Sequence, residues 1–177
     1  MTPGGIAARA SRAFDLLLAA LGALAGLAIA LIAVLVSLEV GMRNVGLGTL
    51  PWLIELVEYA LYAGTFLAAP WVLSLGAHVR VDILLTSLPR RAAVALEVLV
   101  DVAGAAIALA LMRYGLEATL EARRIGALVI KTLVVPEWWL LAVIPFASLL
   151  IAVEFLRRAL RPMASAARRG AAPAEGL

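Results

Sequence analysis

Long apolar runs alternate along the chain with short polar connections. A hydrocarbon core of about 30 Å takes about 20 apolar residues per membrane-crossing helix. Four runs reach this length, at residues 16–38, 51–75, 92–112 and 136–156. The pattern therefore predicts an all-α integral membrane protein with four transmembrane helices.

Prolines and tryptophans mark where two of these helices begin. Pro51 and Pro136 stand where a first helical turn accepts proline. Trp52 and Trp138 follow at the depth where aromatic side chains gather at a membrane surface. Glu55, within the first two turns, suits the positive end of the helix dipole and favours an anchoring role.

The connection before the fourth helix is longer than the others. We expect the third helix to continue beyond the membrane along a face that can carry ion pairs, formed by Arg113, Glu117, Glu121 and Arg124. Residues 125–135 are apolar, but they are too few for a fifth span and contain Lys131. We predict that they form an extended outward connection that packs on the membrane surface or on the protein.

Composition supports a single membrane domain. Of the 177 residues, 64% are apolar and 15% are charged, and the mean hydropathy is +1.04, which excludes an ordinary soluble domain. The expected division is a four-helix domain over residues 1–160 and a disordered cytoplasmic tail over 161–177, which is rich in Ala, Pro and Gly.

Basic residues predict how the chain sits in the membrane. With four spans, ten of them share the side of the two termini and five lie opposite. The ten are Arg9, Arg12, Arg80, Arg90, Arg91, Arg157, Arg158, Arg161, Arg168 and Arg169. Since basic residues concentrate on the cytoplasmic side, both termini are expected inside. These charges lie beside apolar spans, so they do not predict nucleic-acid binding.

Several kinds of chemistry are excluded by composition. The chain has no cysteine and one histidine, His78, which rules out a thiolate metal site and a haem held by two of its own histidines. No serine-hydrolase elbow or phosphate-binding loop occurs in the sequence. We therefore expect no metal, no cofactor and no enzyme activity.

Two acids in the third apolar run need an explanation. Glu97 and Asp101 are four residues apart and share a helix face. A charged acid at the bilayer centre costs about 2.5 to 3.5 kcal/mol. The acids could form a proton or ion relay, or an acid pair satisfied by a neighbouring helix or a partner chain. We favour the acid pair, because no basic or polar partner is visible in the middle of the other spans.

The order of short motifs resembles a known family. The motifs are Arg43, Leu50-Pro51-Trp52, Glu55, Tyr59, Gly76-Ala77-His78-Val79-Arg80-Val81-Asp82, Leu88-Pro89, Val135-Pro136 with Trp138, and Ile144-Pro145. Over residues 14–158 they resemble the small, DctQ-like membrane subunit of tripartite ATP-independent periplasmic (TRAP) transporters. Glu58 departs from the pattern, which more often has a polar or basic residue there.

The resemblance implies a scaffold subunit in a bacterial inner membrane. In that family a large membrane subunit carries an organic acid with sodium, and a periplasmic binding protein delivers it. The resemblance also implies that Trp52 and Glu55 seat the second helix. By the same resemblance, His78, Arg80 and Asp82 shape a cytoplasmic turn.

The two outward connections are candidate partner surfaces. By the resemblance, the segments before Pro51 and before Pro136 are candidates for contact with the binding protein. Arg43 lies in the first of them and Trp138 follows the second. Two other functions remain open: an autonomous proton-linked carrier that uses Glu97 and Asp101, and a membrane anchor for a redox enzyme.

Overall fold

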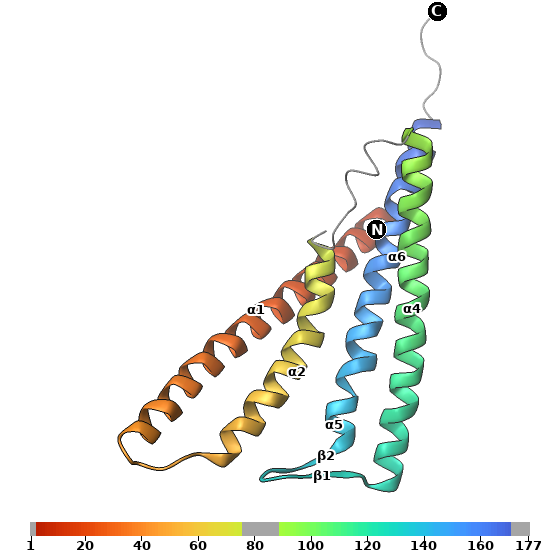
Figure 1. Ribbon diagram of the computed structural model, residues 1–177. Coiled ribbons are helices and arrows are strands. Elements are labelled where there is room, and N and C mark those ends of the chain that lie inside the picture. The colour runs from red at the N-terminus through yellow and green to blue at the C-terminus, as the bar shows by residue number, and fades with distance from the viewer. Residues whose placement is uncertain (1–2, 76–88, 171–177) are drawn as a thin grey trace, which may run out of the picture.

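The computed structural model describes residues 3–75 and 89–170, and most of these are helical (Figure 1). The helices are α1 Pro3–Asn44, α2 Pro51–Ser74, α4 Arg90–Ile125, α5 Glu137–Leu141 and α6 Val143–Gly170, and the strands are β1 Leu128–Ile130 and β2 Val134–Pro136. His78, Arg80 and Asp82 lie outside the described residues.

Four helical segments are long and apolar enough to cross a membrane, which confirms the predicted fold class. They are Arg9–Asn44, Pro51–Ser74, Ala92–Ile125 and Glu137–Leu160, the last made of α5 and the first part of α6. The third helix continues to Ile125, as its charged extension predicted. Helix α6 runs on to Gly170, into the stretch expected as a tail; the division at residue 160 stays a prediction.

The helices pack in the order α1, α2, α6, α4. Helix α2 packs against both α1 and α6, and the most extensive contact joins α6 to the antiparallel α4. In Figure 1, α1 leans steeply away from α4 and α6, so that its C-terminal end is far from them. The bundle is therefore tight around α6 and open on the side of α1.

Two glycines allow this packing. A Cβ atom at Gly22 would collide with the ring of Trp71, and one at Gly104 would come within 2.6 Å of the ring of Phe155. Small residues let helix backbones approach closely, which matters in lipid because no hydrophobic effect drives the helices together. Gly22 thus sets the α1–α2 contact, and Gly104 sets the α4–α6 contact.

The connection before the last helix contains a short β-hairpin, which the sequence analysis did not predict. Helix α4 ends at Ile125 and is capped by Gly126, whose φ of 65° is left-handed and suits glycine. Strands β1 and β2 then pair antiparallel, with Val129 opposite Val135. Branched aliphatic residues fit such a ladder. The hairpin lies across one end of the bundle, here called the hairpin end (Figure 1).

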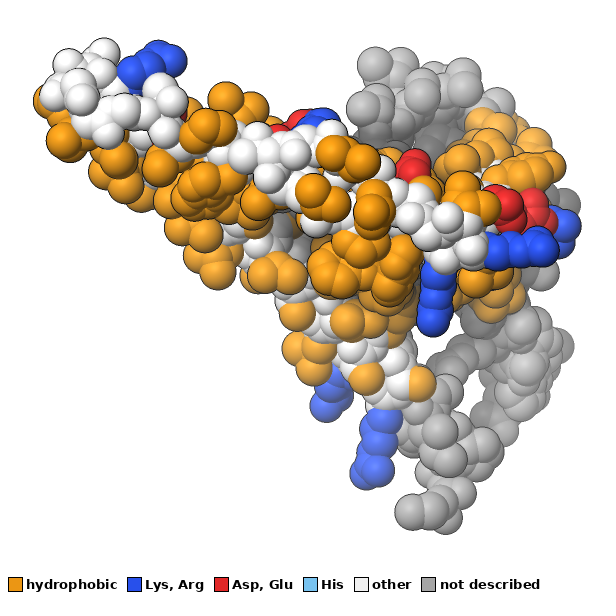
Figure 2. Space-filling model, turned by 90° about the horizontal axis from the view of Figure 1, so that it is seen from below, with side chains coloured by type: hydrophobic (Ala, Val, Ile, Leu, Met, Phe, Trp, Pro, Cys, Tyr) orange, Lys and Arg blue, Asp and Glu red, His pale blue; other side chains and the backbone are white. Residues whose placement is uncertain are grey.

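Most large apolar side chains of the described residues lie on the surface. Leu27, Ile54 and Ile107 are each more than 60% exposed, whereas the buried core consists mainly of small residues and a few leucines. Figure 2 shows hydrophobic side chains spread over the surface seen from the hairpin end. A hydrocarbon environment covers such a surface at no cost, which agrees with a membrane protein.

Candidate functional site

Arg157 joins α6 to α1 at the end of the bundle opposite the hairpin. Its Nη1 donates to Glu154 Oε2 at 3.0 Å, and its Nη2 donates to Asp15 Oδ1 and Ser11 Oγ, both at 2.8 Å. The guanidinium carbon also lies 4.8 Å from the centre of the Phe14 ring. Glu154 is only 1% exposed, so its negative charge depends on this arginine.

Arg158, the next residue, joins α6 to two other helices. Its Nε lies 3.4 Å from Asp101 Oδ1 on α4, and its Nη1 donates to the Leu73 carbonyl near the end of α2, also at 3.4 Å. Asp101 is 5% exposed. The two arginines and their partners, which we call the arginine cluster, therefore connect all four membrane-spanning segments.

The arginine cluster corrects the expectation that no basic partner for the acids exists in the other spans. Asp101 pairs with Arg158 of the same chain. Glu97 lies one turn earlier on α4, is half-buried and also takes part in an interaction. The orientation prediction places both arginines among the charges that follow the fourth span. The signal for the other pair is Glu154, an acid in an apolar helix three residues before Arg157.

A second group of contacts fixes the hairpin to α2. Glu55, 8% exposed, accepts two backbone hydrogen bonds through its carboxylate, from Thr132 N–H to Oε1 and from Leu133 N–H to Oε2, each at 2.7 Å. Both donors lie in the turn between β1 and β2. Hydrogen bonds to an ionised acceptor are among the stronger ones in proteins. Glu55 thus holds the turn, beyond the anchoring of α2 that the sequence predicted.

An exposed ion pair lies beside Glu55. Lys131 Nζ is 2.7 Å from Glu58 Oε2 and 5.7 Å from the centre of the Tyr59 ring, and both charged side chains are partly in solvent. The hydrogen bond to Glu58 raises the pKa of Lys131 above its usual 10.5. Lys131 therefore carries its charge at neutral pH, and the contribution of that charge to stability is lost as the pH rises through the raised pKa. The acid at position 58 thus has a partner in the hairpin turn.

The remaining predicted residues lie near the same end of the bundle. Arg43 is exposed in the last turn of α1, and Trp52 is 41% exposed in the first turn of α2. Pro136 ends β2 and is half-buried. The Arg123 guanidinium carbon lies 5.5 Å from the centre of the Trp138 ring, which links α4 to α5.

The contacts of Glu55 and Glu58 with the turn 131–133 fix the hairpin to α2. We call these two acids and the turn the hairpin clamp.

The described residues contain no group of three or more His, Asp or Glu placed to hold a metal ion. A family model described as tripartite ATP-independent periplasmic transporters, DctQ component, matches residues 32–165. The chain belongs to this family. None of the curated proteins compared with it matches.

A DctQ component is a multi-pass membrane subunit of a transporter and not an enzyme. The matched region of this DctQ chain contains the hairpin clamp and both arginines of the arginine cluster. It begins at residue 32, so the cluster's contacts on α1, Ser11 and Asp15, lie before it.

Replacing Arg158 should destabilise this DctQ chain strongly. Arg158→Met would remove the cation that lies 3.4 Å from the buried Asp101, and breaking a buried ion pair costs about 3 to 5 kcal/mol. We expect the double variant Arg158→Met with Asp101→Leu to regain most of that loss, because replacing both members of a buried pair is often neutral. Thermal unfolding in detergent measures both.

Lys131→Met is the matched control for this experiment. Lys131 belongs to an ion pair with Glu58 whose side chains are 41% and 56% exposed, so its loss should change stability by about 0.5 kcal/mol or less. Unfolding of Arg158→Met at the wild-type temperature would contradict a structural role for the arginine cluster.

Glu55→Gln should loosen the hairpin while the helices stay folded. A neutral amide has one acceptor oxygen and presents N–H groups to the second backbone donor. We expect the amides of Thr132 and Leu133 to exchange with deuterium about tenfold faster or more, measured by mass spectrometry. Glu58→Gln is the control, since it removes only the exposed pair with Lys131; equal exchange in the two variants would show that Glu55 does not hold the turn.

Proposed function

We propose that the chain is the small scaffold subunit of a TRAP transporter in the bacterial inner membrane. In this proposal it braces a large membrane subunit that takes up an organic acid together with sodium, and a periplasmic binding protein delivers the acid. The observation that carries the proposal is the arginine cluster. It joins four membrane-spanning segments through the buried Asp101–Arg158 pair, the Arg157–Asp15 pair and the hydrogen bond of Arg158 to the Leu73 carbonyl.

The arginine cluster suits a part that does not move. If α4 slid past α6, Asp101 would separate from Arg158 within a low-dielectric environment, and breaking a buried ion pair is costly. A large subunit that moves its cargo across the membrane needs a body to move against. A four-helix frame joined through Arg157 and Arg158 meets that need.

The hairpin end supports contact with the binding protein. Leu128, Ile130 and Val134 of the hairpin are 53%, 77% and 59% exposed, and the hairpin clamp holds the turn beside them. Exposed apolar groups on an ordered element favour protein contact. We propose that this surface, together with the segment before Pro51, meets the binding protein on the periplasmic side.

This arrangement requires both termini to lie in the cytoplasm, as the basic residues predict. A cysteine introduced at Val45, in the connection after α1, should then react with an impermeant maleimide in intact cells whose outer membrane has been made permeable. A cysteine introduced at Ala10 should react only after the inner membrane is opened. The reverse pattern would overturn the orientation and the proposed contact with the binding protein.

Copurification tests the scaffold function directly. When the chain is produced with its cognate large subunit, we expect the two to remain together in mild detergent, and uptake in liposomes to require both. Recovery of a solitary, stable monomer from such cells would contradict the proposal. Transport by this chain alone, abolished by Asp101→Asn, would instead support the autonomous proton-linked carrier.

A further inference from the structure

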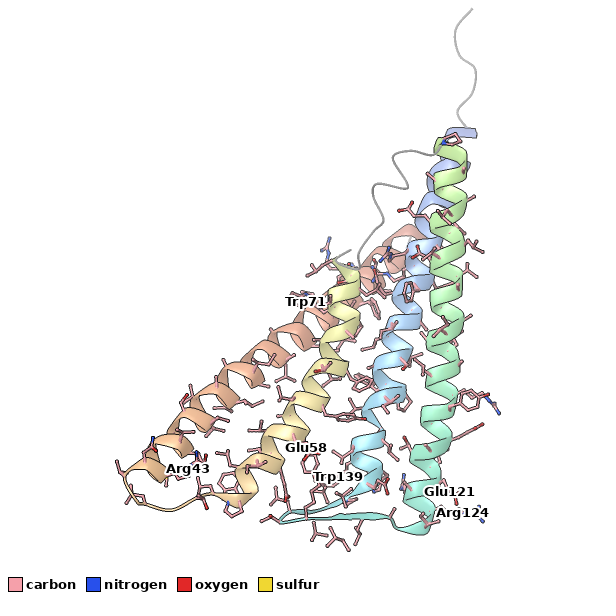
Figure 3. All side chains as sticks on the ribbon, viewed as in Figure 1. Arg43, Glu58, Trp71, Glu121, Arg124 and Trp139 are labelled. Carbon is pink, nitrogen blue, oxygen red and sulfur yellow. The ribbon has the colours of Figure 1, made fainter. Side chains whose placement is uncertain are left out.

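One face of α4 carries charged side chains at its hairpin end. Arg113 Nη2 lies 2.8 Å from Glu117 Oε1, and the two side chains are 73% and 54% exposed. Glu121 and Arg124 continue this exposed face toward the hairpin (Figure 3). Leu109, 48% exposed, lies on the same face one turn before Arg113. We call Leu109, Arg113 and Glu117 the α4 patch.

Contacts of α4 with α6 and α5 give the depth of the α4 patch. Asp101 lies opposite Arg158 at one end, and Arg123 lies against Trp138 at the other. The rise of 1.5 Å per residue makes these two levels about 33 Å apart, close to a hydrocarbon core of about 30 Å. By the same measure Arg113 lies about 18 Å from the Asp101 level and about 15 Å from the level of Trp138.

By this measure the Arg113–Glu117 pair lies at a depth where lipid chains would surround it, whereas the sequence pattern predicts that this part of α4 continues beyond the membrane. Hydrocarbon offers no hydrogen bonds, and charged side chains within membranes almost always face protein or water-filled cavities. A water-filled cavity alone does not fit this position, because Tyr114 and Leu116 beside the pair are 68% and 47% exposed. A surface with both apolar and charged groups at this depth fits another membrane protein.

Helix α1 provides the contrast. No charged residue occurs between Asp15 and Glu39, and Leu27 in this stretch is 67% exposed. In Figure 2 hydrophobic side chains extend along the α1 side, whereas acidic and basic side chains lie together at the opposite edge. A stretch of 23 apolar or small residues is long enough to cross the hydrocarbon core without cover from another protein, particularly when the helix is inclined.

We propose that the α4 patch is the docking surface for the large membrane subunit. That subunit would place polar groups opposite the Arg113–Glu117 pair and apolar side chains opposite Leu109. Charged groups paired across such an interface fix its register and exclude other partners. The inference rests on the proposed function and adds to it which side of this subunit faces the transport machinery.

Single-cysteine crosslinking tests the inference, because the chain has no cysteine of its own. Leu109→Cys and the control Leu27→Cys are each labelled with a benzophenone maleimide in membranes that also contain the large subunit. After irradiation, Leu109→Cys should yield a covalent product with the large subunit, identified by mass spectrometry. Leu27→Cys should yield several-fold less of it.

Three results would overturn the inference. They are capture of the large subunit from Leu27→Cys but not from Leu109→Cys, capture of a second copy of this chain from Leu109→Cys, and equal quenching of a fluorophore at the two positions by brominated lipids. In each case copurification of the large subunit would leave the proposed function standing. Failure of the large subunit to copurify with the wild-type chain would overturn both.

A charge variant gives an independent readout. Arg113→Leu with Glu117→Leu removes the ion pair but keeps the side chains apolar and long, so the fold should survive in lipid. We expect this double variant to retain less of the large subunit in detergent, by about tenfold or more. The reason is that polar groups of the large subunit lose the charged side chains that they pair with. Leu27→Ala should retain the wild-type amount. Equal retention by the two variants would count against the α4 patch.

Discussion

The structure depends on two adjacent arginines that face in different directions. Neighbouring residues on an α-helix point about 100° apart, so Arg157 reaches α1 while Arg158 reaches α4 and α2. Their partners Glu154 and Asp101 are nearly fully buried, and a buried charge is tolerated only when it is paired. Arg157 and Arg158 thus join α6 to the other three membrane-spanning segments, and separating α4 from α6 would break the buried pair of Asp101 with Arg158.

The sequence predicted the four spans well because hydrocarbon sets a physical length that apolar runs must match. Pro51 and Pro136 predicted where α2 and α5 begin, because the first turn of a helix accepts proline. The Asp101–Arg158 pair could not be predicted in this way, since no periodicity relates residues so far apart. Arg158 also lies at the end of a span, where a basic residue can face water or pair with a buried acid equally well. Its place among the charges that predict orientation therefore did not indicate its contact with Asp101.

The hairpin clamp shows the same limit at the other end of the bundle. Residues 125–135 are apolar and short, and that pattern fits a strand pair, a surface segment or a packed loop. Glu55 suited the positive end of a helix dipole, so its position near Pro51 already had a sufficient local explanation. Only the fold brings Thr132 and Leu133 to its carboxylate, where two backbone donors replace the solvent that the burial of Glu55 removes.

Helix α4 carries acids on two faces, and its own chain covers only one of them. Asp101 points to α6 and is buried by it, whereas Glu117 and Arg113 point away and remain exposed between the levels of Asp101 and Trp138. The same energetic rule applies to both, since hydrocarbon rejects a charge whichever helix face carries it. The chain satisfies that rule internally through Arg158. On the opposite face, groups outside this chain must satisfy it. One side of the bundle therefore requires contact with other protein, and the apolar surface alone does not reveal which side that is.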